Sequence, residues 1–215
     1  MAKVVAEISV SLDGFVAGPN PSLEEPLGEG GELLHEWLVR LAAFRRAHGM
    51  EGGEDGPESE LVEESLPASG AVVMGRKMFS GGEGSWDADP ISRGWWGDDP
   101  PFHVPVFVVT HHARESLPME GGTTFNFVTD GVESAVEQAR AAAGEKQVHI
   151  SGGGNVVQQA LSAGLVDELQ LHIAPVLLGG GTRLFDDARN RDVTLERTRV
   201  LEGPQATHLW YRVVR

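Results

Sequence analysis

Basic and polar side chains follow the ends of three apolar segments, and their types suit anion binding. Gly75-Arg76-Lys77 follows the apolar run 71–74, and Thr110-His111-His112 follows the run 104–109. A run of glycines, 152–154, follows the third segment, 147–150. Cations and the unpaired N–H groups of a helix N-terminus both bind phosphate well. The pattern therefore indicates a site for a phosphorylated ligand, built from three strand ends.

The glycine run lies in the most informative stretch, residues 149–185, which reads HISGGGNVVQQALSAGLVDELQLHIAPVLLGGGTRLF. Its strand ends at Ser151, and apolar residues from Val157 onward recur at helical spacing. Glycines allow the backbone to approach a ligand closely, but a tight turn without a ligand is the alternative interpretation. The dinucleotide fingerprint of the Rossmann fold is not met, because its third glycine would fall at Val157.

Composition excludes several other classes of function. A chain of 215 residues with 40% hydrophobic content suits a single domain over residues 1–215. The absence of cysteine excludes disulfides, thiolate metal sites and thiol nucleophiles. A net charge of −15 disfavours nucleic acid as a partner. Because no apolar run approaches about 20 residues and the N-terminus does not resemble a signal peptide, we expect a soluble, cytoplasmic protein without a membrane partner.

Hydrophobic periodicity predicts strands that alternate with helices, and therefore an α/β fold. Helices are expected from about 32 to 48, before residue 66, after Lys77, from Val132 behind a capping box at 130–133, and after the glycine run. This order predicts a mainly parallel sheet with helices on both faces and an antiparallel hairpin at the C-terminus. The strands are expected at 4–12, 71–74, 104–109, 124–128, 147–150, 168–176, 194–201 and 207–214.

Three loops complete the prediction. The segment 18–31 is rich in glycine and proline and is expected to be a lid over a site or a surface excursion. The acidic segment 49–60 is expected to be a solvated loop without a chemical role. The segment 85–103, with Trp86, Trp95 and Trp96, is expected to be irregular, and its aromatic rings either line a cleft or serve in packing or a dimer contact.

Two blocks, AVVMGRKMF at 71–79 and VHISGGGNVVQQAL at 148–161, resemble the cofactor motifs of dihydrofolate reductase. The segment GLVDELQLHIAPVLLGGGTRLF at 164–185 resembles still more the reductase domain of riboflavin biosynthesis, which shares that fold. The resemblance covers most of the chain. It implies a dihydrofolate reductase-like fold with a central sheet of about eight strands, NADPH as the hydride donor, and a homodimer.

The resemblance also assigns cofactor contacts, by residue, to matching positions of this chain. It implies a cis peptide between Gly152 and Gly153. It implies that Gly75, Arg76 and Lys77 contact the NADPH phosphates and that Thr110, His111 and His112 contact the adenosine 2′-phosphate. It implies that the pyrophosphate is bound by Gly153, Gly154, Asn155 and Val156. Val16 and Ala17 are implied to contact the nicotinamide.

Catalytic and substrate residues are less closely determined by these motifs. His35 lies one turn after Glu32 on the expected helix, and either side chain is a candidate to supply a proton during reduction. The alternative for His35 is a partly exposed polar residue of the helix. Trp37 and Ser151 are the substrate candidates, although Ser151 stands where the riboflavin reductase domain carries a glutamate.

Two further features have weaker chemical interpretations. Asp13 is interpreted as a turn residue that could also order the lid. Adjacent His111 and His112 point in opposite directions on a strand end, so we expect no metal site there.

The resemblance, together with the anion site indicated by the residues, implies an NADPH-dependent reductase that transfers hydride to a C=N or conjugated C=C bond of a small pterin-like or pyrimidine-like heterocycle. The alternative is a nucleotide-binding module of the same fold without turnover. A hydrolase is disfavoured, because the chain lacks cysteine and a G-x-S-x-G motif. If Arg76 contacts the 2′-phosphate, Arg76→Ala should weaken NADPH binding far more than NADH binding.

Overall fold

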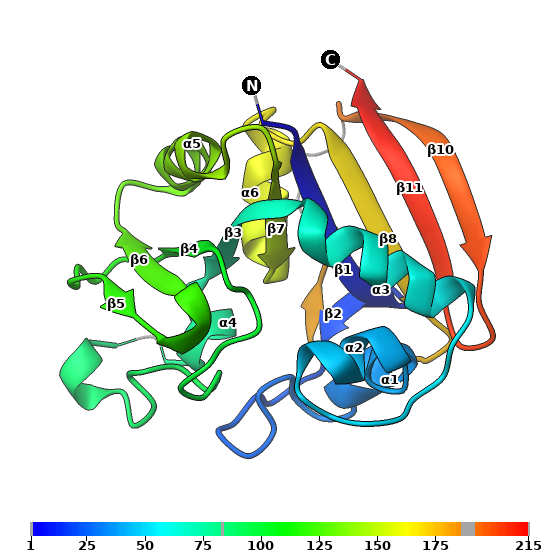
Figure 1. The fold of residues 1–215 in the computed structure, drawn as a ribbon, viewed down its shortest axis with the longest axis horizontal. Helices are drawn as coiled ribbons and strands as arrows, with labels where there is room; N and C mark the ends of the chain where they lie inside the picture. The colour runs from blue at the N-terminus through cyan, green and yellow to red at the C-terminus, as the bar shows by residue number, and fades with distance from the viewer. Residues whose placement is uncertain (1, 83, 186–191, 215) are drawn as a thin grey trace. The chain divides into compact units, whose positions relative to one another are not determined.

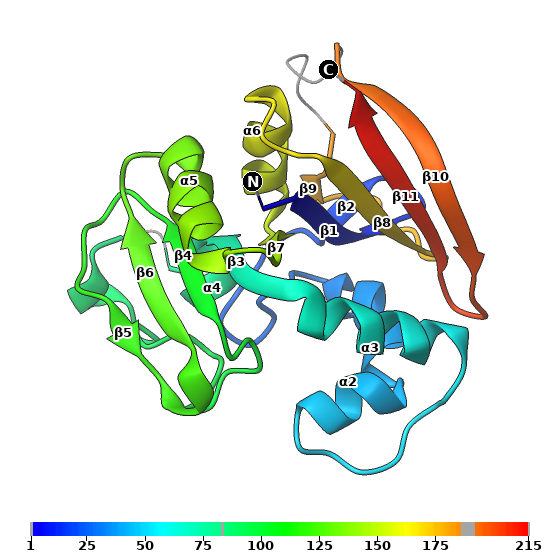
Figure 2. The same ribbon diagram turned by 45° about the horizontal axis from the view of Figure 1, so that its top comes forward.

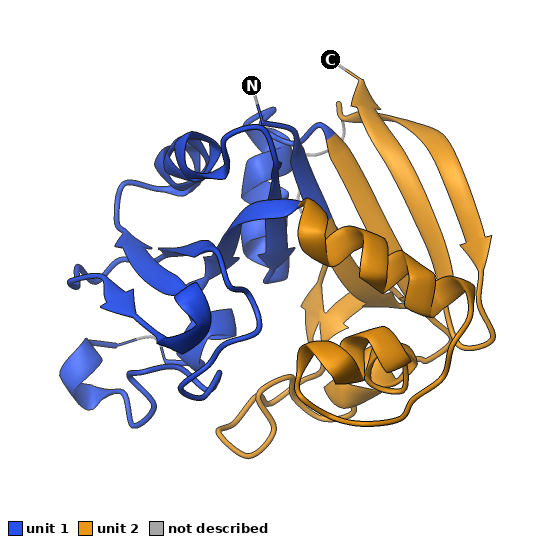
Figure 3. Ribbon diagram, in the orientation of Figure 1, with its two compact units in different colours: residues 1–6, 69–167 blue, residues 7–68, 168–215 orange. Residues whose placement is uncertain are grey.

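The computed structural model describes residues 2–82, 84–185 and 192–214, which form two compact units (Figure 3). Unit 1 contains residues 1–6 and 69–167, and unit 2 contains residues 7–68 and 168–215. The chain therefore passes from one unit to the other within β1 (Val4–Ser11), after residue 68 and after residue 167. The single domain expected from the sequence stays a prediction.

The strands pair in the order β10-β11-β8-β1-β7-β3-β4-β6-β5 (Figure 1). The pairs β1–β7, β7–β3, β3–β4 and β4–β6 are parallel. All eight strands expected from periodicity are present in this sheet. The ninth is the two-residue edge strand β5 (Leu117–Pro118), which pairs antiparallel with β6 and is too short to show a sequence pattern. The α/β fold with a mainly parallel central sheet is thus confirmed.

In unit 1 the parallel strands are covered by helices on both faces. Residues of β3 and β4 alternate between the faces, so Val72 and Val106 lie in one apolar cluster with Phe79 and Phe125. Helix α5 packs against β3 and β4 (Figure 2). The elements are β3 (Ser69–Gly75), α4 (Arg76–Ser80), η2 (Trp86–Ala88), β4 (Pro105–Val109), η3 (Glu120–Gly122), β6 (Thr124–Val128), α5 (Val132–Ala143), β7 (Gln147–Gly152) and α6 (Gly154–Ser162).

Unit 2 contains the antiparallel strands β8, β10 and β11 and the helices that follow β1. The terminal hairpin of β10 and β11 was expected, and β11 also pairs antiparallel with β8 (Figure 1). A second, two-stranded sheet of β2 and β9 was not expected. The elements are β2 (Phe15–Ala17), η1 (Gly31–His35), α1 (Glu36–Val39), α2 (Ala42–Ala47), α3 (Pro57–Ala68), β8 (Glu168–Ala174), β9 (Thr182–Arg183), β10 (Thr194–Glu202) and β11 (Thr207–Val214).

The prediction of one continuous helix from 32 to 48 is wrong. A 3-10 turn, η1, leads into α1, and the chain is extended at Leu41 (φ −71°, ψ 139°) before α2 begins. The break arises because residue 54 pairs with this segment: the Glu54 N–H donates to the Arg40 carbonyl, and the Ala42 N–H donates to the Glu54 carbonyl. Apolar side chains of the segment still face the core, since Leu34, Trp37 and Leu41 are buried.

Two smaller expectations also need correction. The capping box at 130–133 does not form, because Gly131 is the N-cap of α5 and no side chain caps the helix. Helix α3 begins at Pro57, inside the segment expected to be a solvated loop, and it buries Glu58.

Among the described residues, no helix is long and apolar enough to cross a membrane.

Candidate cofactor and substrate sites

The turn between β7 and α6 has the features expected of a phosphate-binding turn. The peptide between Gly152 and Gly153 is cis, as the resemblance implied. The Val156 and Val157 N–H groups donate to the Gly153 carbonyl. Gly154 and Asn155 are the first two residues of α6, and their N–H groups have no acceptor among the described residues. Free N–H groups at the start of a helix attract anions.

Gly153 is not required by the protein's own packing. Its φ is −73°, which any residue can adopt, and a Cβ built there meets nothing within 4 Å. Gly75, at the end of β3, lies beside the same turn: a Cβ there would be 3.1 Å from Val156 Cγ2 and 3.7 Å from the Gly153 nitrogen. Two of the predicted strand ends therefore meet, and the turn leaves open space in front of Gly153.

Arg76, the first residue of α4, points into unit 1 and is only 8% exposed. Its Nη2 donates to Asp89 Oδ2 at 2.6 Å, and its Nε donates to Ser80 Oγ at 3.0 Å. Ser80 Oγ in turn donates to Asp89 Oδ2 at 2.6 Å. Arg76 Nη1 is buried and has no hydrogen-bond partner among the described residues. The guanidinium is thus neutralised by Asp89 but keeps one donor for a further acceptor.

Asp89 remains ionised in this buried position. Burial alone would raise its pKa, but hydrogen bonds from Ser80, Arg76 and the Ile91 N–H outweigh burial, and the net pKa is lowered. Asp89 is not predictable as the partner of Arg76 from the sequence, because it lies in the irregular segment 85–103 and no local motif connects the two residues.

The Trp86 ring contacts two guanidinium groups. The Arg76 carbon Cζ is 3.2 Å from the Trp86 ring centroid, and the Arg114 Cζ is 4.8 Å from it. The indole N–H donates to the His112 carbonyl at 2.9 Å. Burial lowers the pKa of Arg114, and the charges of Arg76 and Arg93 lower it further. Three arginines gather here with Asp89, so this part of unit 1 is rich in positive charge.

The three residues predicted to contact the 2′-phosphate, Thr110, His111 and His112, follow the end of β4. Thr110 is buried, and its Oγ1 accepts the His112 N–H at 3.2 Å. His111 is exposed, and His112 is half-buried next to Trp86. Lys77 is exposed on α4. The predicted contacts of these residues with a cofactor stay predictions.

The arrangement in unit 1 fits a phosphorylated nucleotide on two structural grounds. Arg76 Nη1 is a buried donor without an acceptor in the part of the chain that the structure describes, which is costly unless a ligand supplies the acceptor. The space at Gly153 would be filled by any side chain larger than hydrogen. Both features suit phosphate oxygens, which accept hydrogen bonds from guanidinium and backbone N–H groups.

The predicted proton donors lie in unit 2, on η1. Glu32 is exposed, whereas His35 is half-buried, and its buried Nδ1 atom has no partner among the described residues. Burial lowers the pKa of His35, and the charge of His172 lowers it further. At neutral pH His35 therefore favours the uncharged form, which is a poorer acid than the imidazolium that the sequence argument considered.

The predicted substrate and nicotinamide residues have different environments. Trp37 is 4% exposed and its indole N–H donates to Ser9 Oγ at 3.2 Å, so most of its ring serves in the core of unit 2. Ser151 is half-buried near the end of β7. Val16 and Ala17 lie on β2, and Ala17 pairs with Thr182. The predicted contacts of these residues with a substrate or cofactor stay predictions.

The aromatic residues of the segment 85–103 serve in packing. Trp95 Nε1 donates to the Met78 carbonyl at 2.8 Å, and Trp96 packs edge-on against Phe102 with ring centroids 4.8 Å apart. Trp86, Trp96 and Phe102 all contact the apolar cluster of unit 1. Of the alternatives left open by the sequence, packing is the one these contacts support.

Asp13 is more than a turn residue, because its carboxylate connects two segments far apart in sequence. It accepts a hydrogen bond from Ser11 Oγ at 2.6 Å, from the Leu178 N–H at 3.1 Å and from the Gly179 N–H at 2.7 Å. Hydrogen bonds from Ser11 Oγ and from the two backbone N–H groups together outweigh the opposing effect of burial and lower the pKa of Asp13 to about 2. The carboxylate therefore holds the loop after β8 throughout the neutral pH range.

We expect Asp13→Ala to loosen this loop without unfolding the protein. The Leu178 and Gly179 amides should exchange hydrogen several-fold faster, because their acceptor is gone, and the difference should persist to acid pH since the pKa is about 2. Hydrogen exchange by mass spectrometry measures it. Asp130→Ala, at an exposed aspartate, is the control; equal exchange in both variants would contradict the assigned contact.

Comparison with known proteins places the chain in a family. The family model of the RibD C-terminal domain matches residues 2–209. The chain belongs to the RibD C-terminal domain family. It is 35% identical over 199 residues to the "Uncharacterized protein YyaP" of Bacillus subtilis (strain 168), an alignment that covers 88% of this chain and 83% of that protein.

Solved structures resemble this member of the RibD C-terminal domain family in fold. A putative riboflavin biosynthesis protein from Shewanella sp. PV-4 has a TM-score of 0.62 at 22% identity, with all of both chains covered. A diaminohydroxyphosphoribosylaminopyrimidine deaminase/5-amino-6-(5-phosphoribosylamino)uracil reductase from Thermotoga maritima has a TM-score of 0.56 at 13% identity, over 99% of this chain and 57% of that one. The chain thus spans little more than half of the Thermotoga protein.

Proposed function

We propose that this chain is an NADPH-dependent reductase that transfers hydride to a C=N or conjugated C=C bond of a small pterin-like or pyrimidine-like heterocycle. The observation that carries the proposal is the open space at Gly153, next to Gly75 and at the N-terminus of α6, in a chain of the RibD C-terminal domain family. The name of the Thermotoga protein, a uracil derivative reductase, supports the substrate class. Its fold similarity supports only the architecture.

In this proposal unit 1 binds the phosphates of the cofactor. The N–H groups of Gly154 and Asn155 would bind the pyrophosphate, and Arg76 Nη1 and the residues after β4 would bind the 2′-phosphate. Bound NADPH would supply the hydride. Val16, Ala17 and Ser151 remain the candidates for contacts with the nicotinamide and the substrate.

The proton that accompanies hydride transfer needs a donor, and the structure changes the order of the candidates. His35 is largely uncharged at neutral pH because of burial. The exposed Glu32, or water held by either side chain, is then at least as suitable. The Glu32→Gln and His35→Gln variants, compared by the pH profile of kcat, would separate these donors.

Calorimetry with NADPH and NADH tests the proposal directly. We expect NADPH to bind about tenfold or more tightly than NADH, because only NADPH carries the phosphate that charge-assisted hydrogen bonds from arginine would recognise. Absorbance of NADPH in the presence of dihydropterins, pyrimidine ribosides and imines then reports turnover. Absence of NADPH binding at millimolar concentration would contradict the proposal.

A test of Arg76 in cofactor binding requires a variant in which Asp89 is not left as a buried charge without its partner. In Arg76→Met/Asp89→Asn both charges are removed together, which limits the cost in stability. We expect this variant to lose most of the preference for NADPH over NADH while NADH binding changes little. Equal losses for the two cofactors would show that Arg76 does not recognise the 2′-phosphate.

The second candidate function is a nucleotide-binding module of the same fold that does not turn over. The neutral form of His35 and the packed position of Trp37 both favour it, since they reduce the number of side chains available for chemistry. NADPH binding without oxidation on any compound of the panel would support the module.

A further inference from the structure

Four side chains of unit 2 form a series of hydrogen bonds that no proposed step uses; three of them are buried, and the Glu7 side chain is 25% exposed. Glu7 Oε1 lies 3.0 Å from His172 Nε2, and His172 Nδ1 lies 2.7 Å from His208 Nδ1. His208 Nε2 lies 2.8 Å from Glu58 Oε1. His172 and His208 are 3% and 0% exposed, and Glu58 is also buried. A histidine pair between two carboxylates thus spans the interior of unit 2.

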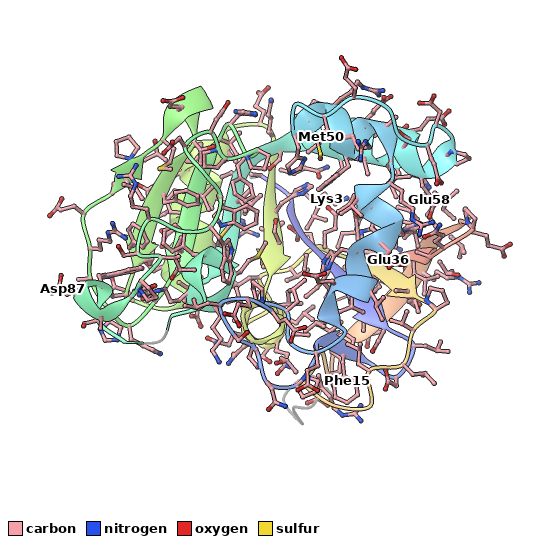
Figure 4. The ribbon with its side chains drawn as sticks, turned by 90° about the horizontal axis from the view of Figure 1, so that it is seen from below. Lys3, Phe15, Glu36, Met50, Glu58 and Asp87 are labelled. Carbon is pink, nitrogen blue, oxygen red and sulfur yellow. The ribbon has the colours of Figure 1, made fainter. Side chains whose placement is uncertain are left out.

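The fold determines this arrangement through strand register. β8 and β11 are antiparallel, and His172 is the direct partner of His208, so the two rings meet on one face of the sheet. Glu58 comes from α3, which also donates a hydrogen bond from Ser65 Oγ to Glu7 on β1. Figure 4 labels Glu58 on α3. The Trp37 ring packs on both imidazoles, with centroids 4.7 Å from each.

In their usual ionisation states, these four side chains carry too few protons for the three hydrogen bonds. The three contacts need three protons, one in each hydrogen bond. Two neutral histidines carry only one N–H each, and two ionised carboxylates carry none. If both Nε2 atoms donated to carboxylates, the two Nδ1 atoms would face each other with lone pairs at 2.7 Å. With neutral histidines and ionised glutamates, the three hydrogen bonds therefore lack one proton.

We propose that Glu7, His172, His208 and Glu58 together bind one additional proton at neutral pH and form a buried proton-storage site. Glu58 is its acid: the Glu58 O–H donates to His208 Nε2, the His208 Nδ1–H donates to His172 Nδ1, and the His172 Nε2–H donates to the Glu7 carboxylate. All three hydrogen bonds are then complete, and the group carries a single negative charge.

The surroundings agree with this placement of the proton. Burial raises the pKa of Glu58, and the nearby Glu54 carboxylate raises it further, against an opposing effect of His172. Burial lowers the pKa of His208 to about 4, so that ring is neutral; His172 and Arg199 on β10 lower it too, and Glu7 opposes them. His35 on η1 also interacts with His172.

The site links folding to pH with a defined sign. Above the ordinary histidine pKa of about 6.5, the unfolded chain has neutral histidines and ionised glutamates, so the folded protein binds one more proton. The pKa of Glu58 is raised on folding, and its contribution to stability is therefore lost as pH rises through the folded value. Because unfolding releases this one proton, the unfolding equilibrium constant should rise about tenfold for each unit by which pH increases.

Urea unfolding of the full chain between pH 6.5 and 8.5 tests the proposal with Glu58→Gln. The glutamine amide can donate to His208 Nε2 without a titratable proton, so the hydrogen bonds persist and the extra pH dependence disappears. The logarithm of the unfolding constant should rise by about one unit per pH unit more in wild type than in this variant. Glu60→Gln, at an exposed glutamate of the same helix, should retain the wild-type slope. Equal slopes in wild type and Glu58→Gln would overturn the proposal.

Nitrogen-15 NMR of the wild-type histidine side chains gives a second test that needs no variant. We expect opposite tautomers, with the proton on Nδ1 in His208 and on Nε2 in His172. Two neutral rings that both carry the proton on Nε2 would overturn the proposal even if Glu58→Gln failed to fold. The inference does not rest on the proposed reductase function, because neither measurement requires a cofactor or a substrate.

Discussion

Replacing Asp89 with alanine is expected to destabilise the protein by about 3–5 kcal/mol, because it leaves the buried Arg76 guanidinium without its counter-charge. Asp89 accepts hydrogen bonds from Arg76, Ser80 and the Ile91 N–H, and its side chain is 2% exposed. Such a loss is a large fraction of the stability of a typical domain. Urea unfolding at neutral pH measures it.

Two controls make the Asp89 result specific. Asp87→Ala changes an exposed aspartate two residues away (Figure 4), and we expect it to alter stability by less than about 0.5 kcal/mol. The double variant Asp89→Ala/Arg76→Met should recover part of the loss, since no buried charge remains. A loss for Asp89→Ala no greater than that for Asp87→Ala would contradict the role of the buried pair.

The pH dependence of this effect follows from the direction of the pKa shift. The pKa of Asp89 is lowered in the folded protein from the ordinary value of 3.8. The stability contributed by the pair is therefore present above that value and is lost as pH falls through the folded pKa. The difference between wild type and Asp89→Ala should accordingly be constant near neutral pH and shrink in acid.

The second large effect is expected at the glycine turn: Gly153→Ala should weaken NADPH binding by about tenfold or more, or about 1.4 kcal/mol. The added methyl group meets no protein atom within 4 Å, and the backbone φ of −73° suits alanine. The fold should therefore survive, while the methyl group occupies the space proposed for the pyrophosphate. Calorimetry measures the affinity, and thermal unfolding verifies the fold.

Gly84→Ala is the matched control for this substitution. Gly84 also has open space at its Cβ position and no positive φ, but it lies outside the turn between β7 and α6. NADPH should bind this variant as it binds wild type. If Gly153→Ala also bound NADPH with unchanged affinity, the pyrophosphate would have to be bound elsewhere, and the proposed cofactor site would be wrong.

Much of the fold could be predicted from the sequence because it depends on local patterns. Buried parallel strands such as β4 and β6 are short apolar runs between turn residues, and their limits in the structure match the prediction to within one residue. The glycine run before α6 and the hairpin of β10 and β11 were likewise readable, because periodicity and turn residues lie within a few positions of one another. The residue types alone also indicated an anion site at these strand ends.

Contacts between distant residues were decided only by the tertiary structure. Arg76 looks like a free cation in the sequence, but Asp89, thirteen positions later in an irregular segment, neutralises most of it. The helix expected at 32–48 is broken at Leu41 because Glu54 pairs with the chain there. His172 and His208, 36 residues apart, meet through the register of β8 and β11, and Glu58 reaches them from a segment that reads as a solvated loop. Local periodicity in the sequence indicates which face of a helix or strand is apolar. The pairing of polar side chains depends instead on strand register and on which loops come close to each strand, and packing of the whole unit determines both.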